Sequence, residues 1–436
     1  MSIFGAMTTA VSGLSAQAAA FGNISDNIAN SQSVGFKAVD TNFVNYLTLS
    51  TPTLNESGSV VARPDYSNNV QGAITQSTDP LALAISGQGF FAVSQAAGST
   101  SGDVQNFSSQ QYFTRAGDFS LDKNGYLVNG EGQFLDGWPV DTSTNIVNQT
   151  ALTPIQVTQN TFQPIATSTI NLSADLPATP TPGQPITSQV NVYDSVGNLH
   201  TVTLNWTQNA ANDWTVAVSS PDNTSGTTIG SAEVKFGTTS GNAVSPGTIG
   251  SVGNATGAVT TSAFAAGQPA DLTFTANFGN GPQSVALSLG NFGTGSGLTQ
   301  YAGSSFNLLG INQNGVPQGN FSNLTISQQG DVVVNYDNGQ SRTIAQVPIT
   351  NFNAPDALQR QNGQAFTASS GSGNPLTNAV GSNGAGTLVV GSTESSNVDI
   401  ATEFTKLIAA QEAYSANAKV ITTADQLTQT TINMKQ

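Results

Sequence analysis

The residue types that most often build catalytic and metal sites are scarce in this chain. Its 436 residues include no cysteine and one histidine, His200. The absence of cysteine excludes a disulfide framework and a cysteine-based zinc site. His200 shares strand parity with Val202, Leu204 and Trp206, and no Gly-x-Ser-x-Gly motif accompanies it. We therefore expect a structural histidine on one face of a strand, and we expect no catalytic residue.

Charged residues are the second shortage. They make up 8% of the chain, against roughly 25% in ordinary soluble domains. Ten lysines and arginines stand against 25 aspartates and glutamates, so the net charge is −15. Between Asn124 and Ser341 the only basic residue is Lys235. Because a polyanion needs a basic surface to bind, we expect no nucleic-acid partner.

Long apolar runs are also missing, above all at the start of the chain. No lysine or arginine precedes Lys37, and residues 1–30 mix Ala with Ser, Thr, Gln and Asn. A secretory signal peptide has a basic start and a continuous apolar stretch, and a membrane-spanning helix needs about 20 apolar residues. The sequence therefore predicts no cleaved signal peptide and no membrane partner. If the protein is secreted, its route needs no cleaved signal.

Two short patterns resemble ligand-binding motifs only in part. The glycine-rich run 293–297 contains no lysine and opens no predicted helix, unlike a phosphate-binding loop. Asp122-x-Asn124-Gly125 begins like a calcium loop, but no glutamate follows at the twelfth position. Both runs are typical of turns in β-structure. We therefore expect no cofactor and no metal.

The two ends of the chain carry a seven-residue apolar repeat that is absent between them. The residues of this repeat are Phe4, Met7, Val11, Leu14, Phe21 and Ile28 at one end, and Ile400, Phe404, Leu407, Tyr414, Ala418 and Ile421 at the other. An apolar heptad repeat predicts helices that pack as a coiled coil. Asn397 or Asp399 is a suitable N-cap for the second helix.

Two arrangements of these helices are open. In the first, the helices pair in one molecule and across neighbouring copies, so that the repeat forms a polymerisation seam. In the second, a helical hairpin merely closes one domain. The first is favoured, because heptad repeats are typical of association and a helix of this kind would be about 45 Å long. The main expected partner is therefore a second copy of the chain.

The middle of the chain predicts β-structure with many tight turns. Asn124-Gly125 and Asn338-Gly339 lie between apolar runs and are strong hairpin signals. Residues 151–310 include a proline-rich entry and then alternating strands with Gly or Asn turns. We expect this region to be a β-sandwich or barrel inserted into a loop of the first β-domain. The predicted fold class is mainly β with long terminal α-helices, which combines coiled-coil N- and C-terminal helices with two nested β-domains.

The expected domains run out along the chain and back again. They are an N-terminal helix at 1–30, a linker at 31–69, the first β-domain at 70–150, an inserted outer β-domain at 151–310, the rest of the first β-domain at 311–370, a linker at 371–395 and the C-terminal helix at 396–436. The first linker is predicted from its polar, irregular composition, which includes Pro52 and Pro64. This nesting brings both ends of the chain together.

Several motifs resemble those of the bacterial flagellar rod and hook axial proteins. Seven segments are similar to that family's signatures. They are residues 1–17, 23–30 and 34–37 near the start, 84–91, 113–119 and 124–128 in the first β-domain, and 396–420 near the end. Within the family, the large inserted domain and the segment 193–204 are most similar to the hook proteins. We identify no motif of the family by eye in residues 219–310.

The resemblance implies a structural subunit. Hook subunits polymerise outside the cell into a curved, hollow tube, which joins the rod to the filament and transmits motor torque as a universal joint. They are exported by the flagellar type III apparatus without a cleaved signal peptide. The implied partners are further copies of the chain, the distal rod protein, the hook cap, the hook–filament junction proteins and the export apparatus. The alternatives are a distal-rod or hook-associated axial protein and, more remotely, a secreted adhesin or hydrolase.

Overall fold

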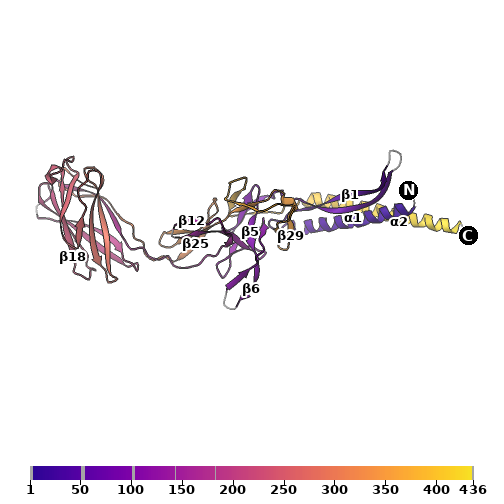
Figure 1. Cartoon of the computed structure of the whole chain (residues 1–436), viewed down its shortest axis with the longest axis horizontal. Helices are drawn as coiled ribbons and strands as arrows, with labels where there is room; N and C mark the ends of the chain where they lie inside the picture. Colours follow the sequence, from indigo (N-terminus) through magenta and orange to yellow (C-terminus); the bar gives the residue numbers. More distant parts are fainter. Residues whose placement is uncertain (1–2, 51–54, 101–103, 143, 182, 435–436) are drawn as a thin grey trace. The chain divides into compact units, whose positions relative to one another are not determined.

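The computed structural model describes residues 3–50, 55–100, 104–142, 144–181 and 183–434 (Figure 1). The chain divides into two compact units. The first combines residues 1–159, 323–335 and 341–436, and the second combines 160–322 and 336–340. The first two and last two residues of the predicted terminal helices lie outside the described residues.

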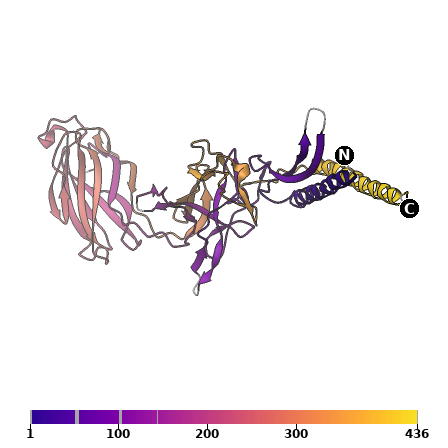
Figure 2. The ribbon, with the colours of Figure 1, turned by 45° about the vertical axis from the view of Figure 1, so that its right-hand side comes forward.

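Two long helices from opposite ends of the chain lie side by side in the first unit (Figure 2). They are α1 (Ile3–Ala29) and α2 (Ile400–Asn433). Asp399 is the N-cap of α2, and its side chain accepts hydrogen bonds from the backbone N–H of Ala401 and Thr402. Asn397, the other candidate cap, instead accepts a hydrogen bond from the backbone N–H of Ala38, at 2.7 Å. The prediction of paired terminal helices is confirmed.

The prediction of a linker at 31–69 is wrong. Most of this segment is a long antiparallel hairpin, β1 (Val39–Ser50) and β2 (Asn55–Tyr66), which packs against α1. The Ser12 hydroxyl accepts a hydrogen bond from the backbone N–H of Val60 at 3.1 Å, and Asn23 donates one to Thr41 at 2.8 Å. Both strands of a two-stranded ribbon are edge strands, so the ribbon tolerates Pro64 and polar side chains. Its composition is therefore similar to that of a loop.

The β-domain of the first unit is built on one large sheet with the strand order β25-β26-β27-β11-β5-β8-β30-β29. These strands are β25 (Phe321–Ile326), β26 (Asp331–Tyr336), β27 (Ser341–Gln346), β11 (Phe134–Asp141), β5 (Phe91–Ser94), β8 (Tyr112–Thr114), β30 (Ala365–Thr367) and β29 (Gln359–Gln361). Phe90, Phe113, Phe352 and Phe366 meet edge to face in its core. The short helix η2 (Pro355–Ala357) precedes β29.

Short strands complete this unit. Along β11 lie β10 (Leu127–Val128), β12 (Ile146–Val147) and β13 (Thr153–Pro154), and β9 (Ser120–Leu121) pairs with β10. The hairpin β9–β10 turns at Asn124-Gly125, where Gly125 has a φ of 80°. The predicted hairpin at this Asn-Gly pair is confirmed. A separate hairpin consists of β6 (Ala96–Thr100) and β7 (Val104–Phe107).

The prediction of a linker at 371–395 is also wrong. This segment contains β31 (Leu376–Asn378), β32 (Thr387–Val390) and β33 (Ser392–Glu394). They pair with β28 (Ile349–Asn351), β4 (Leu83–Ser86) and β3 (Ile74–Gln76), respectively. The glycines that suggested a flexible linker lie at turns between these strands; Gly381, Gly384 and Gly391 all have positive φ. The chain therefore enters α2 from a segment fixed to the β-domain.

The second unit is a β-sandwich. Its first sheet contains β14 (Thr169–Pro177), β20 (Val259–Thr261), β21 (Pro269–Asn277), β22 (Pro282–Asn291), β23 (Leu298–Tyr301) and β24 (Asn307–Gln313). Its second sheet contains β15 (Ile186–Tyr193), β16 (Leu199–Ala210), β17 (Asp213–Ser219), β18 (Thr228–Phe236) and β19 (Ile249–Gly257), and η1 (Gly237–Ser240) follows β18. One apolar core, which includes Trp206, Trp214 and Phe274, joins the two sheets.

The two sheets are open, with no closed barrel among the described residues of this unit. Of the two predicted architectures, the sandwich is therefore confirmed and the barrel is wrong. The unit's edges also differ from the expected span of 151–310. Residues 153–154 pair with β11 of the first unit, and β24, which runs to Gln313, pairs with β14. Strand pairing sets the boundaries of the unit in the sequence. A change of composition along the sequence does not reveal which strands pair.

Candidate assembly interface

Alanines make up most of the buried residues of the two terminal helices. The buried residues are Ala10, Ala16, Ala20, Ile24 and Asn27 on α1, and Glu403, Ala410 and Ala424 on α2. Gly13 lies so close to α2 that an added Cβ would be 2.9 Å from the side-chain nitrogen of Asn417. A side chain at position 13 would therefore require the Asn417 side chain to shift. Alanine is the commonest buried residue of the helix pair, and most of the large apolar residues remain exposed or half-buried.

The structure places the predicted seam residues on the flanks and outer faces of this helix pair. Five are exposed: Phe4 (74%), Val11 (54%), Ile400 (40%), Phe404 (50%) and Tyr414 (42%). Seven are half-buried: Met7, Leu14, Phe21, Ile28, Leu407, Ala418 and Ile421. One pair meets across the helices, because the rings of Phe21 and Tyr414 lie 6.2 Å apart in an edge-to-face contact. A single chain thus covers the predicted seam only in part.

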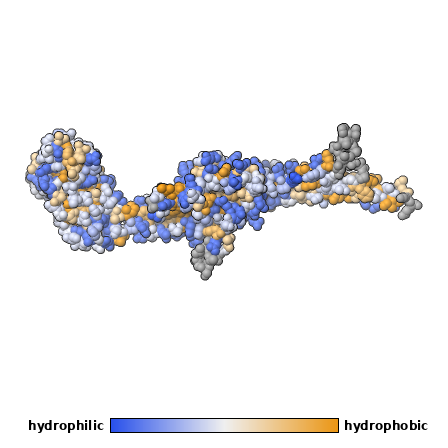
Figure 3. All heavy atoms as spheres, viewed as in Figure 1, coloured by the Kyte–Doolittle hydropathy of each residue, from blue (hydrophilic) through white to orange (hydrophobic). Residues whose placement is uncertain are grey.

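Other apolar residues extend the exposed surface. They are Ile3 on α1 and Ile408, Val420, Leu427, Ile432 and Met434 on α2, and Figure 3 shows apolar side chains on the visible face of the helix pair. A hollow of about 510 Å³ is lined by Ile3 and Ala6 of α1 and by Val420, Ala424 and Leu427 of α2. A helix that is apolar on two faces needs a covering on both. The heptad count missed the alanine face, although alanines spaced along both helices are its signal.

A buried ionic cluster anchors the base of the helix pair to the β-domain. The Glu394 carboxylate contacts Lys37 Nζ at 2.5 Å and Arg115 Nη1 at 2.8 Å. The side chains of Lys37 and Glu394 are fully buried, and that of Arg115 is 3% exposed. Glu394 also accepts a hydrogen bond from the backbone N–H of Gly72, and Lys37 donates one to the carbonyl of Val70. The cluster joins segments that lie hundreds of residues apart in the sequence.

Burial sets the electrostatics of this cluster. Removal from water lowers the pKa of both Lys37 and Arg115, and the negative charge of Glu394 opposes that shift. Two cations thus depend on one carboxylate. Lys37 follows α1 and Glu394 precedes α2, so the same contact fixes both helices to the β-domain. The sequence offered one hint, since Lys37 closes an N-terminal motif, but it gave no partner for that lysine.

A second polar cluster lies one turn further along the helices. The amide of Asn27 bonds to the backbone of Val39 in both directions, at 2.9 and 3.0 Å, and donates to Glu403 at 3.2 Å. Lys406 bonds to Glu403 at 2.8 Å and to Asp40. Burial lowers the pKa of Lys406, but its hydrogen bonds to Asp40 and Glu403 outweigh this effect and raise the pKa. This cluster ties α1, α2 and the β1–β2 hairpin together.

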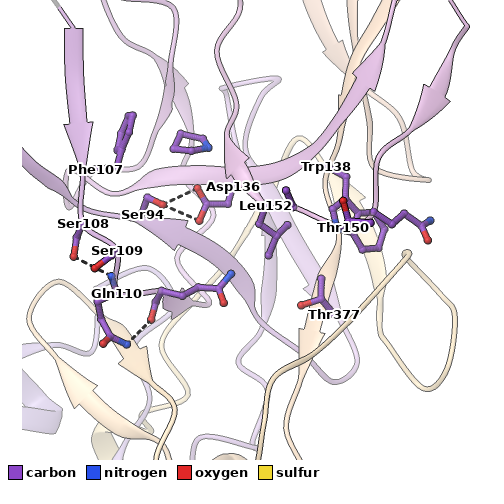
Figure 4. Close-up of a pocket in the computed structure, with 14 residues that line it drawn as sticks. Ser94, Phe107, Ser108, Ser109, Gln110, Asp136, Trp138, Thr150, Leu152 and Thr377 are labelled. Atoms are coloured by element: carbon purple, nitrogen blue, oxygen red, sulfur yellow. Dashed lines mark hydrogen bonds between the residues drawn. The ribbon is translucent and has the colours of Figure 1, made fainter.

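One hollow in the β-domain has a buried carboxyl group in its wall. The hollow measures about 570 Å³, and its lining includes Asp136, Trp138 and Leu152 (Figure 4). Asp136 is 3% exposed, and the hydroxyl of Ser94 lies 2.9 Å from each of its carboxylate oxygens. Burial raises the pKa of Asp136 to about 7, although the hydrogen bond from Ser94 lowers it in part.

This carboxyl group makes stability depend on pH. The folded chain holds the Asp136 proton up to about pH 7, whereas an unfolded aspartate releases it near its ordinary pKa of 3.8. The free energy of unfolding should therefore fall by roughly 1.4 kcal/mol per pH unit between these values and level off above pH 7. Asp136→Asn should flatten this slope and make the chain more stable than the parent at pH 8. Denaturant titrations at pH 5 and pH 8 measure both effects.

An exposed aspartate on β2 supplies the control for this prediction. Asp65→Asn removes the same charge at the surface and should leave the parent's slope in place. An equal slope in the parent and in Asp136→Asn would contradict the assignment of the pH dependence to Asp136.

His200 lies in a polar and aromatic setting in the second unit. Its ring stacks on Phe278, with 4.2 Å between centroids and 6° between planes. Its two nitrogens lie 3.0 Å from Asp222 and 3.3 Å from Asp194. Asn280 donates a further hydrogen bond to Asp194 at 2.7 Å. These contacts hold one end of β16 against the neighbouring turns, which agrees with a structural histidine.

Metal sites and membrane-spanning helices are two other features to consider among the described residues. No group of three or more His, Cys, Asp or Glu side chains in that part of the chain is placed to hold a metal ion. Of the helices described, none has the length and apolar character that crossing a membrane requires.

Family models match the chain in four places. They describe the flagella basal body rod protein (residues 7–37), the D1 domain of flagellar hook protein FlgE/F/G (84–172), the D2 domain of flagellar basal body protein FlaE (166–316) and the C-terminal region of flagellar basal body rod FlgEFG protein (389–434). The matches cover both helix-forming ends and both β-units.

Several whole proteins of similar sequence are named flagellar hook protein FlgE. The flagellar hook protein FlgE of Brucella abortus is 31% identical over 441 residues, which covers 100% of both chains. The chain belongs to the flagellar hook protein family. FlgE of Salmonella typhimurium is also 31% identical, over 98% of this chain and 99% of its own. A crystal structure of Helicobacter pylori FlgE2 aligns with 74% of this chain and 99% of its own at 14% identity, with a TM-score of 0.48. As a member of this family, the chain is a structural subunit of the flagellar hook.

Proposed function

We propose that this hook subunit polymerises through the outer faces of α1 and α2 into a curved, hollow tube that transmits torque from rod to filament while it bends. The observation that carries the proposal is the unburied apolar surface of the paired helices. Phe4, Phe404 and Ile408 are each at least half exposed in the single chain. Burying one such side chain against a neighbour contributes about 1.5–3 kcal/mol, and several per subunit would drive assembly.

The buried ionic cluster supports the torque-bearing part of the proposal. A load applied to the helices reaches the β-domain through Lys37, Glu394 and Arg115, which have no solvent around them. Ion pairs shielded from water resist displacement, because a separated charge would remain buried and unpaired. The helices and the β-domain would then move as one body. Bending would be taken up between copies, where sparse charge leaves few ionic contacts to break.

The partners and the route follow from the same proposal. The tube would contact the distal rod protein at one end and the hook cap or hook–filament junction proteins at the other. The subunit would leave the cell unfolded through the flagellar type III apparatus, without a cleaved signal peptide. It would act as a structural protein and not as an enzyme. A chain without cysteine suits this route, since no disulfide must form before or after export.

The absence of cysteine also provides the experiment. Ser225 lies on an exposed turn of the second unit, whereas the neighbouring Asn223 is buried and hydrogen-bonded to Gly226. Cells that express Ser225→Cys should bind a membrane-impermeant maleimide dye at one short spot at the base of each filament. The parent chain, which has no thiol, is the control. Fluorescence microscopy of living cells measures the position of the dye.

Two other outcomes would count against the proposal. Dye along the whole filament would identify a filament subunit. A second site guards against a covered label position: Gln329→Cys, on an exposed turn of the first unit. If motile cells show no spot at the filament base with Ser225→Cys and none with Gln329→Cys, the chain is not an exposed hook subunit.

A further inference from the structure

The scarcity of cations raises a question about contacts between copies. Each chain has a net charge of −15, so copies that polymerise bring like charges together. Among the described lysines, Lys37, Lys235 and Lys406 are held in ion pairs within the chain. Lys123 and Lys419 are the exposed lysines of that part of the chain, and neither takes part in an ion pair. Few lysines of the described residues are thus left to meet carboxylates of a neighbour.

Lys123 stands at the tip of a firmly held turn. It lies between β9 and β10, where the Asp122 carboxylate accepts hydrogen bonds from the backbone N–H of Asn124 and Tyr126, at 2.9 and 2.7 Å. Gly125 packs so closely on residue 157 of the same chain that an added Cβ would lie 2.2 Å from the carbonyl oxygen of Val157. The turn therefore presents the Lys123 side chain from a rigid base, and little conformational entropy is lost if a neighbour holds it.

The hollow beside Asp136 has the chemistry to receive such a side chain. Asp136 is the one charged residue in the described lining, and the Ser94 hydroxyl supplies one proton to a carboxylate that can accept several. Trp138 and Leu152 offer apolar wall for the methylene stem of a lysine. Gln110 and Thr150 add polar groups to the lining. Above about pH 7, where Asp136 has lost its proton, an ammonium group placed here would bond to a carboxylate shielded from water, where charge-assisted hydrogen bonds are strong.

We propose that Lys123 of one copy inserts into the Asp136 hollow of a neighbouring copy in the polymer. The proposal rests on the proposed function, because it requires copies to assemble. The turn and the hollow are formed by different residues of one chain, so in a helical polymer the contact would be heterologous, the type that builds open helical polymers. Each copy would give one lysine and receive one. This would add a polar, specific contact between β-domains to the apolar contact between helices.

Two substitutions test the energetic part. Lys123→Ala and Asp136→Asn should each raise the critical concentration for polymerisation about tenfold, which corresponds to about 1.4 kcal/mol per contact. The double variant should be little worse than either single variant, because the two residues form one contact. Lys123→Arg keeps the cation and should stay within about threefold of the parent. Additive effects of Lys123→Ala and Asp136→Asn would overturn the pairing.

Engineered cysteines test the geometry. Chains that carry Lys123→Cys and chains that carry Ser109→Cys, at the rim of the hollow, should form a disulfide dimer when they copolymerise under mild oxidation. Chains with Ser225→Cys in place of Lys123→Cys are the matched control and should give no such dimer. If the parent forms no polymer at all, the proposed function fails. If polymers form with an unchanged critical concentration in Lys123→Ala, or without the disulfide dimer, this inference fails alone.

Discussion

Replacing Phe404 by aspartate is expected to abolish polymerisation and to leave the β-units folded. Phe404 is 50% exposed on α2 in the single chain, so the change removes no buried core. In a polymer the same position would lie against a neighbour. The variant would lose about 1.5–3 kcal/mol of apolar burial and would bring an unpaired carboxylate into the contact, at a cost of several kcal/mol more. The critical concentration should rise at least about a hundredfold.

Sedimentation of polymers from purified chains measures this effect, and circular dichroism reports on the β-units. Thr405→Asp is the matched control, because Thr405 is the next residue, is also exposed and lies about 100° further around the helix than Phe404. It should polymerise like the parent. Normal polymers from Phe404→Asp would contradict the assignment of this face to assembly. Loss of polymers in both variants would point to a general intolerance of α2 to charge.

The terminal helices could be predicted from sequence because their apolar residues repeat with the period of a helix. The repeat gave both helices, but it did not separate their two faces. Alanines such as Ala10 and Ala410 are buried, whereas larger residues such as Phe404 remain exposed. A heptad count gives more weight to large side chains, although close approach of two helices favours small ones. The size of the side chains therefore decides which face of each helix packs within the chain. A hydrophobic pattern does not contain that information.

The two supposed linkers show a different limit. Residues 39–50, 55–66 and 376–394 are polar and rich in turn residues, yet they contain strands. Their strands are edges or short ladders, where backbone hydrogen bonds supply most of the pairing and side chains remain partly in water. Partners such as β4 with β32 lie about 300 residues apart in sequence, so no local signal joins them. The Asn-Gly hairpins were found because both partners and the turn lie within a few residues of each other.

The buried charges were beyond sequence reasoning for the same reason. Lys37, Arg115 and Glu394 look like three ordinary charged residues, and only the fold brings them together. Asp136 likewise gives no sign of burial in its local sequence, since a single aspartate in a strand can face either side. In a chain with so few charges, however, each charged residue is worth tracing to its partner. Among the described basic residues, Lys37, Arg115, Lys235 and Lys406 are held in ion pairs by this fold.

Glu394→Gln is expected to destabilise the first unit by about 3–5 kcal/mol, the usual cost when one partner of a buried ion pair is removed. The glutamine leaves Lys37 and Arg115 buried without a counter-charge, so both cations must lose protons, take up water or move apart. That loss is a large share of the roughly 5–15 kcal/mol that holds an ordinary domain folded. Because the cluster lies just after the end of α1 and just before the start of α2, the ends of these helices nearest the β-domain should loosen first.

Hydrogen exchange measured by mass spectrometry separates this effect from general unfolding. Peptides from residues 24–40 and 390–405 should lose protection in Glu394→Gln, while peptides from β17 in the second unit should keep theirs. Glu412→Gln removes one carboxylate from an exposed position on α2 and should change neither set. Unchanged protection at the base of the helices in Glu394→Gln would show that water or a rearranged side chain replaces the carboxylate without cost.

A second substitution tests whether the cost arises from unpaired charge. Lys37→Met removes one of the two buried cations and keeps a side chain of similar length in the same apolar setting. In the parent it should be destabilising, because Glu394 loses its closest partner. In Glu394→Gln it should instead restore part of the lost stability, since one fewer cation is left unpaired. A double-mutant cycle on the free energy of unfolding measures this coupling. A coupling near zero would mean that the cluster holds the helices through shape alone, and that the buried charges add nothing to the anchor.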